Sequence, residues 1–134
     1  MRLIYILTIL VTVATVWAEP VFVVGSKVTL SSLSKENIES ILKGKMKTWS
    51  TGERIDLVVL SGGSTNQAVL STYASLDPDQ FDSHWQRLVF TGKATMPKKF
   101  STEAEVAKYI ATSDYGLGYV DSSVAGSLKT LKVE

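Results

Sequence analysis

The sequence has no cysteine and a single histidine, His84, among its 134 residues. Without cysteine the chain forms no disulfide, so a hydrophobic core must stabilise it. Thiolate metal sites are also excluded, and only an oxygen-ligated site for a hard cation remains open. The acidic run from Asp77 to Asp82 lacks the glycine and distal glutamate of a calcium loop, and we interpret it as a helix start. We therefore predict no metal site and no cofactor.

The sequence also has few of the residues that hydrolytic catalysis needs. A serine nucleophile requires a base and an orienting carboxylate, and the Gly-x-Ser-x-Gly elbow does not occur in this chain. His84 lies close to Phe81 and Trp85 in the sequence, which favours a packing or surface role over a catalytic one. We predict no catalytic residue and expect that the protein is not an enzyme; a hydrolase is the least favoured reading.

Neither sign of charge predominates. The chain has 14 Lys and Arg side chains against 13 Asp and Glu, which gives a formal net charge of +1. Binding to nucleic acid or to an anionic membrane surface relies on a basic patch. The composition shows no such excess, so we expect no nucleic-acid partner.

The first 18 residues form a segment with its own signature. Arg2 precedes an uncharged, mostly apolar stretch that ends in Val16, Trp17 and Ala18. A charged start, an apolar run and a small residue at the end are typical of a secretory signal peptide. A membrane anchor is the alternative, but a spanning helix needs about 20 predominantly apolar residues, and threonines interrupt this run. We predict cleavage after Ala18, which leaves one exported domain over residues 19–134 with no stable membrane insertion.

Apolar runs and helix-capping residues alternate along the rest of the chain. We predict strands at residues 21–24, 55–60, 115–120 and 128–133, the last as a half-exposed edge strand. Helices are predicted to begin at the capping residues Ser34, Ser64, Asp77 and Thr102, and Gly44 is predicted to end the first helix. This order predicts an α/β fold with a mixed, partly parallel sheet flanked by helices. The predicted core comprises Val23, Ile41, Leu42, Val59, Leu70, Trp85, Leu88, Ile110 and Val120.

The stretch from Leu60 to Leu70, LSGGSTNQAVL, is the candidate binding segment. It follows a predicted strand and begins a predicted helix, where unpaired N–H groups and the helix dipole favour an anion. Glycines allow close approach to the backbone, and hydroxyls add donors. The candidate oxyanion-binding residues are Ser61, Gly62, Gly63, Ser64 and Thr65. The alternative is that Ser64 caps its own helix, with Gln67 in capping-box spacing, and that the glycines only make the turn.

Two longer stretches carry a resemblance to a known family. The segment IESILKGKMKTWSTGERI at residues 38–55 and the segment from His84 to Val120, which ends in GLGYV, resemble phosphate-transporter substrate-binding proteins. The resemblance implies the type II periplasmic binding protein fold, in which two α/β lobes close around an oxyanion. It implies one such lobe for this chain, and together with the signal peptide it implies a periplasmic location.

The binding segment departs from that family at two positions. Where the family's turn has an arginine and an aspartate, this chain has Leu60 and Gly62. The resemblance therefore implies a solute-binding-like protein for phosphate or a similar oxyanion, belonging to or related to an ABC transport system. The alternative is a periplasmic protein-interaction module that keeps the fold without anion binding. A protein partner or a second copy of the chain covering the turn fits either interpretation, and Lys45 or Lys47 is a candidate to replace the missing positive charge.

Overall fold

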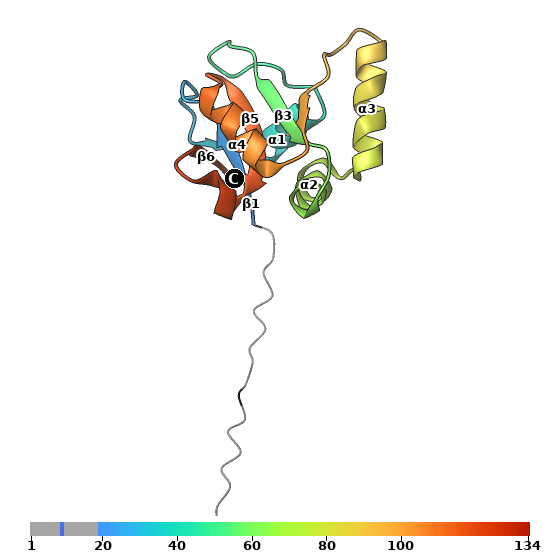
Figure 1. Cartoon of the computed structure of the whole chain (residues 1–134). Helices are drawn as coiled ribbons and strands as arrows, with labels where there is room; N and C mark the ends of the chain where they lie inside the picture. The colour runs from blue at the N-terminus through green and yellow to red at the C-terminus, as the bar shows by residue number, and fades with distance from the viewer. Residues whose placement is uncertain (1–8, 10–18) are drawn as a thin grey trace, which may run out of the picture.

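A computed structural model describes residue 9 and residues 19–134 (Figure 1). The predicted signal peptide over residues 1–18 and its cleavage site lie outside the described residues, apart from Ile9. Within the described part, every helix is too short or too polar to cross a membrane.

Strands and helices alternate along residues 19–134. The strands are β1 (Pro20–Val24), β2 (Ser32–Leu33), β3 (Asp56–Leu60), β4 (Lys98–Phe100), β5 (Gly116–Asp121) and β6 (Lys129–Val133). The helices are α1 (Lys35–Leu42), α2 (Ser64–Val69), the π-helical turn η1 (Leu70–Ala74), α3 (Pro78–Phe90), α4 (Glu103–Thr112) and α5 (Ser122–Ala125). The predicted α/β fold with a mixed sheet is confirmed.

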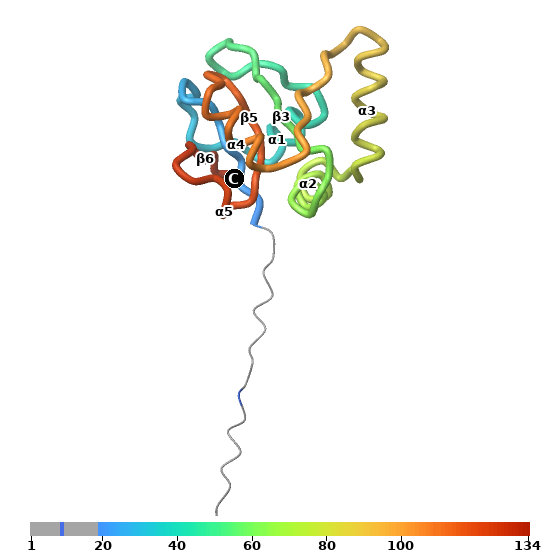
Figure 2. The backbone as a smooth tube through the Cα atoms, viewed as in Figure 1, coloured from blue at the N-terminus to red at the C-terminus, as the bar shows by residue number. Residues whose placement is uncertain are grey.

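The strands form one six-stranded sheet with the order β2-β6-β1-β5-β3-β4. β1 is antiparallel to both of its neighbours, β5 and β6, whereas β3 is parallel to β5 and to β4. The trace in Figure 2 shows how the N-terminal β1 enters between segments from the C-terminal end of the chain. The sheet centre therefore joins both ends of the described chain.

Helices cover both faces of this sheet. A Cβ atom built on Gly118 of β5 would lie 3.0 Å from Val106 Cγ1 of α4, so α4 packs closely on that face. The next residue, Tyr119, points to the opposite face, where its hydroxyl meets Asn66 of α2. The alternation along β5 thus places α4 on one face and α2 on the other.

The predicted core is largely confirmed, with a correction in α3. Of the nine predicted core residues, eight are buried, but Leu88 is only half-buried. α3 lies beside the sheet in Figure 1 rather than on either face, and its anchors are the buried side chains of Phe81 and Trp85. The Trp85 indole N–H donates to the Leu42 carbonyl at 2.9 Å. The far end of the helix is left in solvent, and Phe90 there is 94% exposed.

Three of the predicted helix starts are confirmed in detail. Ser34 accepts a hydrogen bond from the Asn37 amide at 3.2 Å, and Thr102 accepts one from the Glu105 amide at 3.2 Å. Asp77 and Gln80 form a reciprocal capping box at the start of α3. Gly44 follows the end of α1 with φ of 74°, as expected for a helix-terminating glycine.

The prediction that the last strand lies at the sheet edge is wrong. β2 pairs with the outer side of β6, with Ser32 opposite Lys132 and Leu33 opposite Val133. β2 has only two residues and leaves no alternating pattern in the sequence, so the sequence does not reveal a strand on this side of β6. β4 was missed for a similar reason, because its three residues include Lys98 and Lys99.

Candidate functional site

The five candidate residues form a surface turn at the carboxyl end of β3. The Ser61 amide donates to the Phe100 carbonyl at 2.9 Å, which ties the start of the turn to β4. Gly62, Gly63 and Ser64 are exposed, and a Cβ atom built on either glycine would meet no heavy atom within 4 Å. The turn is therefore open to solvent above its backbone.

The prediction that Ser64 caps α2 is wrong. Gly63 is the N-cap residue, with φ of 93° and ψ of 169°, and within residues 19–134 the helix start has no side-chain cap hydrogen bond. This backbone conformation is strained for residues other than glycine, and it places Ser64 inside the helix. The first helical bond within α2 runs from the Gln67 amide to the Gly63 carbonyl at 3.1 Å. The preceding amides are thus left without a helical acceptor or a side-chain cap.

The three hydroxyl-bearing residues of the turn differ in exposure. Ser61 and Ser64 are exposed, whereas Thr65 is 3% exposed. Ser61 and Ser64 can present their hydroxyls to a ligand in solution. The backbone amide of Thr65 belongs to the uncapped first turn of α2.

A buried polar network supports the turn, and it joins residues too far apart in the sequence to leave a local pattern. The Tyr119 hydroxyl accepts a hydrogen bond from the Leu60 amide at 3.3 Å and donates to Asn66 Oδ1 at 2.5 Å. Burial raises the pKa of Tyr119 well above its ordinary range, so the phenol stays protonated and remains a donor. Leu60 and Asn66 flank the five candidate residues on either side, and one tyrosine therefore holds both ends of the turn.

Leu60 supplies no charge to the turn, and Lys99 and Lys47 have other partners. Leu60, where the resembling family has an arginine, is 4% exposed and faces the core. Lys99, which lies opposite Val59 in the pairing of β3 with β4, forms an ion pair with Asp82 at 2.7 Å. Lys47 donates to the Lys93 carbonyl and lies beside residues at the other end of β3, so it does not replace the missing arginine.

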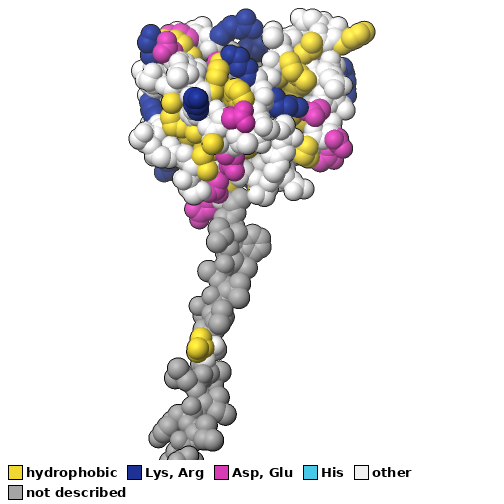
Figure 3. Space-filling view, viewed as in Figure 1, with side chains coloured by type: hydrophobic (Ala, Val, Ile, Leu, Met, Phe, Trp, Pro, Cys, Tyr) yellow, Lys and Arg dark blue, Asp and Glu magenta, His cyan; other side chains and the backbone are white. Residues whose placement is uncertain are grey.

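Trp49 and His84 have structural contacts. The Trp49 indole N–H donates to the Tyr115 carbonyl at 3.0 Å, and Trp49 is buried. His84 Nε2 lies 2.8 Å from the Lys43 carbonyl, which links α3 to the end of α1. In Figure 3, acidic and basic side chains are interspersed over the face in view.

Comparison with solved structures supports the fold at low sequence identity. The chain is similar to an ABC-type phosphate transport receptor from Vibrio cholerae, with 13% identity, a TM-score of 0.65, and coverage of 87% of this chain and 46% of that one. It is similar to a putative phosphate ABC transporter substrate-binding protein with bound phosphate from Clostridium perfringens, with 15% identity, a TM-score of 0.66, and coverage of 87% and 45%. PstS from Borrelia burgdorferi matches with 15% identity, a TM-score of 0.61, and coverage of 90% and 49%.

These matches concern the architecture of a lobe and not a whole receptor. The chain spans about half the length of the solved structures that it matches. A search among curated proteins found no significant match. The model of a family described as PBP superfamily domain matches residues 12–134, which include all of the strands and helices above. This chain therefore belongs to the family described as PBP superfamily domain.

Proposed function

We propose that the protein is an exported, non-enzymatic solute-binding-like protein that binds phosphate or a similar oxyanion at residues 61–65. The observation that carries this proposal is the uncapped start of α2 at Gly63. The N–H groups near Gly63, Ser64 and Thr65 are the donors, and the hydroxyls of Ser61 and Ser64 add to them. The bound anion lies over Gly62 and Gly63, where no atom of residues 19–134 comes within 4 Å of a Cβ built on either glycine.

A tetrahedral oxyanion suits this arrangement because it offers several acceptor oxygens to the neighbouring amide and hydroxyl donors. A helix start favours negative charge even where no charged side chain is present. Each neutral hydrogen bond contributes only about 1 kcal/mol net in water. A bidentate arginine is a stronger contact, and Leu60 replaces it here. The expected affinity is therefore weak, in the millimolar range.

The affinity for the anion depends on whether a second protein surface covers the turn. Solvent competes for every donor at an exposed turn, and a closed cleft excludes that competition. A second copy of the chain or a protein partner lying over Ser61 and Ser64 would strengthen each contact. The similarity to phosphate transport receptors supports a role in, or relationship to, an ABC transport system, and the segment 1–18 supports a periplasmic location.

Calorimetric titration with phosphate and with sulfate tests this function. We expect weak binding that Ser64→Ala reduces and that the matched control Ser127→Ala, an exposed serine outside the turn, leaves unchanged. Gly63→Val would add backbone strain as well as bulk, because φ at Gly63 is 93°. A loss of binding in this variant would therefore not report on bulk alone. Gly62→Val is the better test of close approach, since Gly62 has no positive φ and its Cβ position is open.

The second candidate function is a periplasmic protein-interaction module. The buried Leu60 favours it, because this position supplies no charge to the turn. If phosphate and sulfate neither bind nor raise the melting temperature at millimolar concentration, the open turn is a structural helix start and the interaction module becomes the preferred function.

A further inference from the structure

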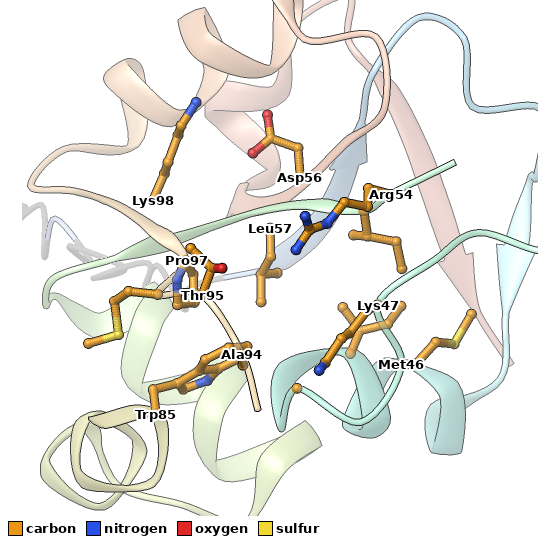
Figure 4. Close-up of a pocket in the computed structure, with 14 residues that line it drawn as sticks. Met46, Lys47, Arg54, Asp56, Leu57, Trp85, Ala94, Thr95, Pro97 and Lys98 are labelled. Atoms are coloured by element: carbon orange, nitrogen blue, oxygen red, sulfur yellow. The ribbon is translucent and has the colours of Figure 1, made fainter. Parts of the chain in front are cut away.

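A cleft of about 320 Å³ opens at the amino end of β3, away from the turn (Figure 4). Its walls come from α1, β3, α3 and the segment that leads into β4, with apolar contributions from Ile41, Leu57, Trp85 and Ala94. None of residues 61–65 lines it. Leu57 is the last residue of β3 in the cleft wall, and the four residues from there to Ser61 span roughly 13 Å at the usual rise per residue.

Two cationic side chains point into this cleft. Figure 4 shows the Arg54 guanidinium over the space beside Leu57, and the Lys47 side chain directed towards Ala94 and Trp85. Among residues 19–134, Arg54 belongs to none of the ion pairs, which join Lys27 to Asp114, Lys43 to Glu39 and Lys99 to Asp82. The Lys47 ammonium donates to the Lys93 carbonyl, an acceptor that carries no formal charge.

The carboxylate among the lining residues does not neutralise these cations. Asp56 points out of the cleft in Figure 4. Its Oδ2 atom accepts hydrogen bonds from the hydroxyls of Tyr109 and Ser113, the latter at 3.1 Å. Lys98 also turns away and donates to the Tyr109 hydroxyl. The interior thus combines apolar walls with uncompensated positive charge.

We propose that this cleft is a second ligand site, for a small organic anion whose carboxylate meets Arg54 and whose flat apolar body lies against Leu57 and Trp85. The volume falls at the lower end of the range for small-molecule sites, which limits the ligand to one or two rings. Burial of the apolar body provides the main driving force, and the guanidinium orients the carboxylate by a charge-assisted contact.

Inorganic phosphate does not suit this cleft. It has no apolar surface to bury against Ile41, Leu57 and Trp85, and apolar walls cannot replace the water that it would lose. The open turn at residues 61–65 is its expected place. The two sites are therefore distinguished by the chemistry of their ligands as well as by their position on β3.

Chemical-shift titration of the isotope-labelled protein tests the proposal with three probes. Indole-3-acetate carries both ligand features, indole-3-ethanol lacks the charge, and inorganic phosphate lacks the apolar body. We expect indole-3-acetate to shift the Leu57 and Ala94 amides and the Trp85 indole N–H with saturation at low millimolar concentration. Indole-3-ethanol should bind the same residues about tenfold more weakly, which is the loss of roughly 1.4 kcal/mol. Phosphate should not shift these signals.

Substitutions distinguish the contact between Arg54 and the ligand carboxylate from general effects on the protein. Arg54→Gln should weaken indole-3-acetate binding several-fold and leave indole-3-ethanol unaffected, whereas the control Arg87→Gln, an exposed arginine outside this cleft, should change neither. Ala94→Leu should block both indole probes by filling the space. Ser64→Ala should not alter them, so failure of the phosphate site leaves this test intact. The proposal is overturned if indole-3-acetate gives no saturable shifts in the cleft, or if the charged and neutral probes bind equally well.

Discussion

The Tyr119 hydroxyl joins the two ends of the turn, with its oxygen 3.3 Å from the Leu60 amide nitrogen and 2.5 Å from Asn66 Oδ1. Leu60 ends β3 and Asn66 lies in the first turn of α2, so this contact fixes the angle at which the helix leaves the strand. Asn66 is 2% exposed, and its oxygen depends on Tyr119 for a donor. The shape of the proposed anion site therefore depends on a residue of a neighbouring strand.

Tyr119→Phe should lower the free energy of unfolding by about 1–3 kcal/mol, because Asn66 Oδ1 would then be buried without a donor. Urea denaturation measures this loss. The matched control is Tyr73→Phe, since the Tyr73 ring packs edge-on against Phe22 and its hydroxyl lies outside the network. Equal losses in the two variants would contradict a specific role for Tyr119.

Stability should fall at alkaline pH in a way that depends on Tyr119. Burial holds the pKa of Tyr119 in the folded protein above the ordinary tyrosine value of about 10. A pKa raised on folding adds stability that is fully present below the unfolded value and is lost as the pH rises from that value through the folded one. Unfolding free energies measured across this alkaline range should decline, and less steeply for Tyr119→Phe. An identical decline in both proteins would contradict the assignment.

Gly118→Ala should destabilise the protein by about 1–3 kcal/mol, because the added methyl group lies 3.0 Å from Val106 Cγ1 and must displace α4 or strain the side chain. Gly62→Ala is the control, since it adds the same group where no atom lies within 4 Å. Thermal unfolding of the two variants gives the comparison. If Gly118→Ala unfolds at the same temperature as the control, α4 does not pack on β5 as described.

The elements with strong local patterns were predicted from the sequence. Asp77 and Gln80 have the spacing of a capping box and form one, and the apolar residues 21–24 form the central strand β1. The pairing of strands needed the structure, because β2 covers β6 through only Ser32 and Leu33. Leu88 was predicted to lie in the core but is half-buried. Helix periodicity identifies the apolar face of α3, but it does not show how far along the helix other elements cover that face.

The position of the candidate turn was predicted from the sequence, but the hydrogen bonds of Tyr119 that support it were not. Glycine and serine after an apolar run predict a strand-to-helix turn, and the turn lies there. Capping propensity favoured Ser64 at the N-cap, whereas Gly63 takes this position with a positive φ that only its tertiary setting imposes. The contacts of Tyr119 with Leu60 and Asn66 join residues more than fifty positions apart and leave no local pattern.

Phosphate titration of the isotope-labelled protein, followed through the backbone amides of Gly63, Ser64 and Thr65, tests the central proposal most directly. These amides should shift progressively and saturate in the millimolar range, as expected for N–H groups that donate to an anion. Gly62→Val should abolish the shifts while the Leu57 and Trp85 signals stay unchanged. Absence of any saturable shift at these three amides in the unmodified protein, with the fold intact, would contradict an oxyanion site at this turn.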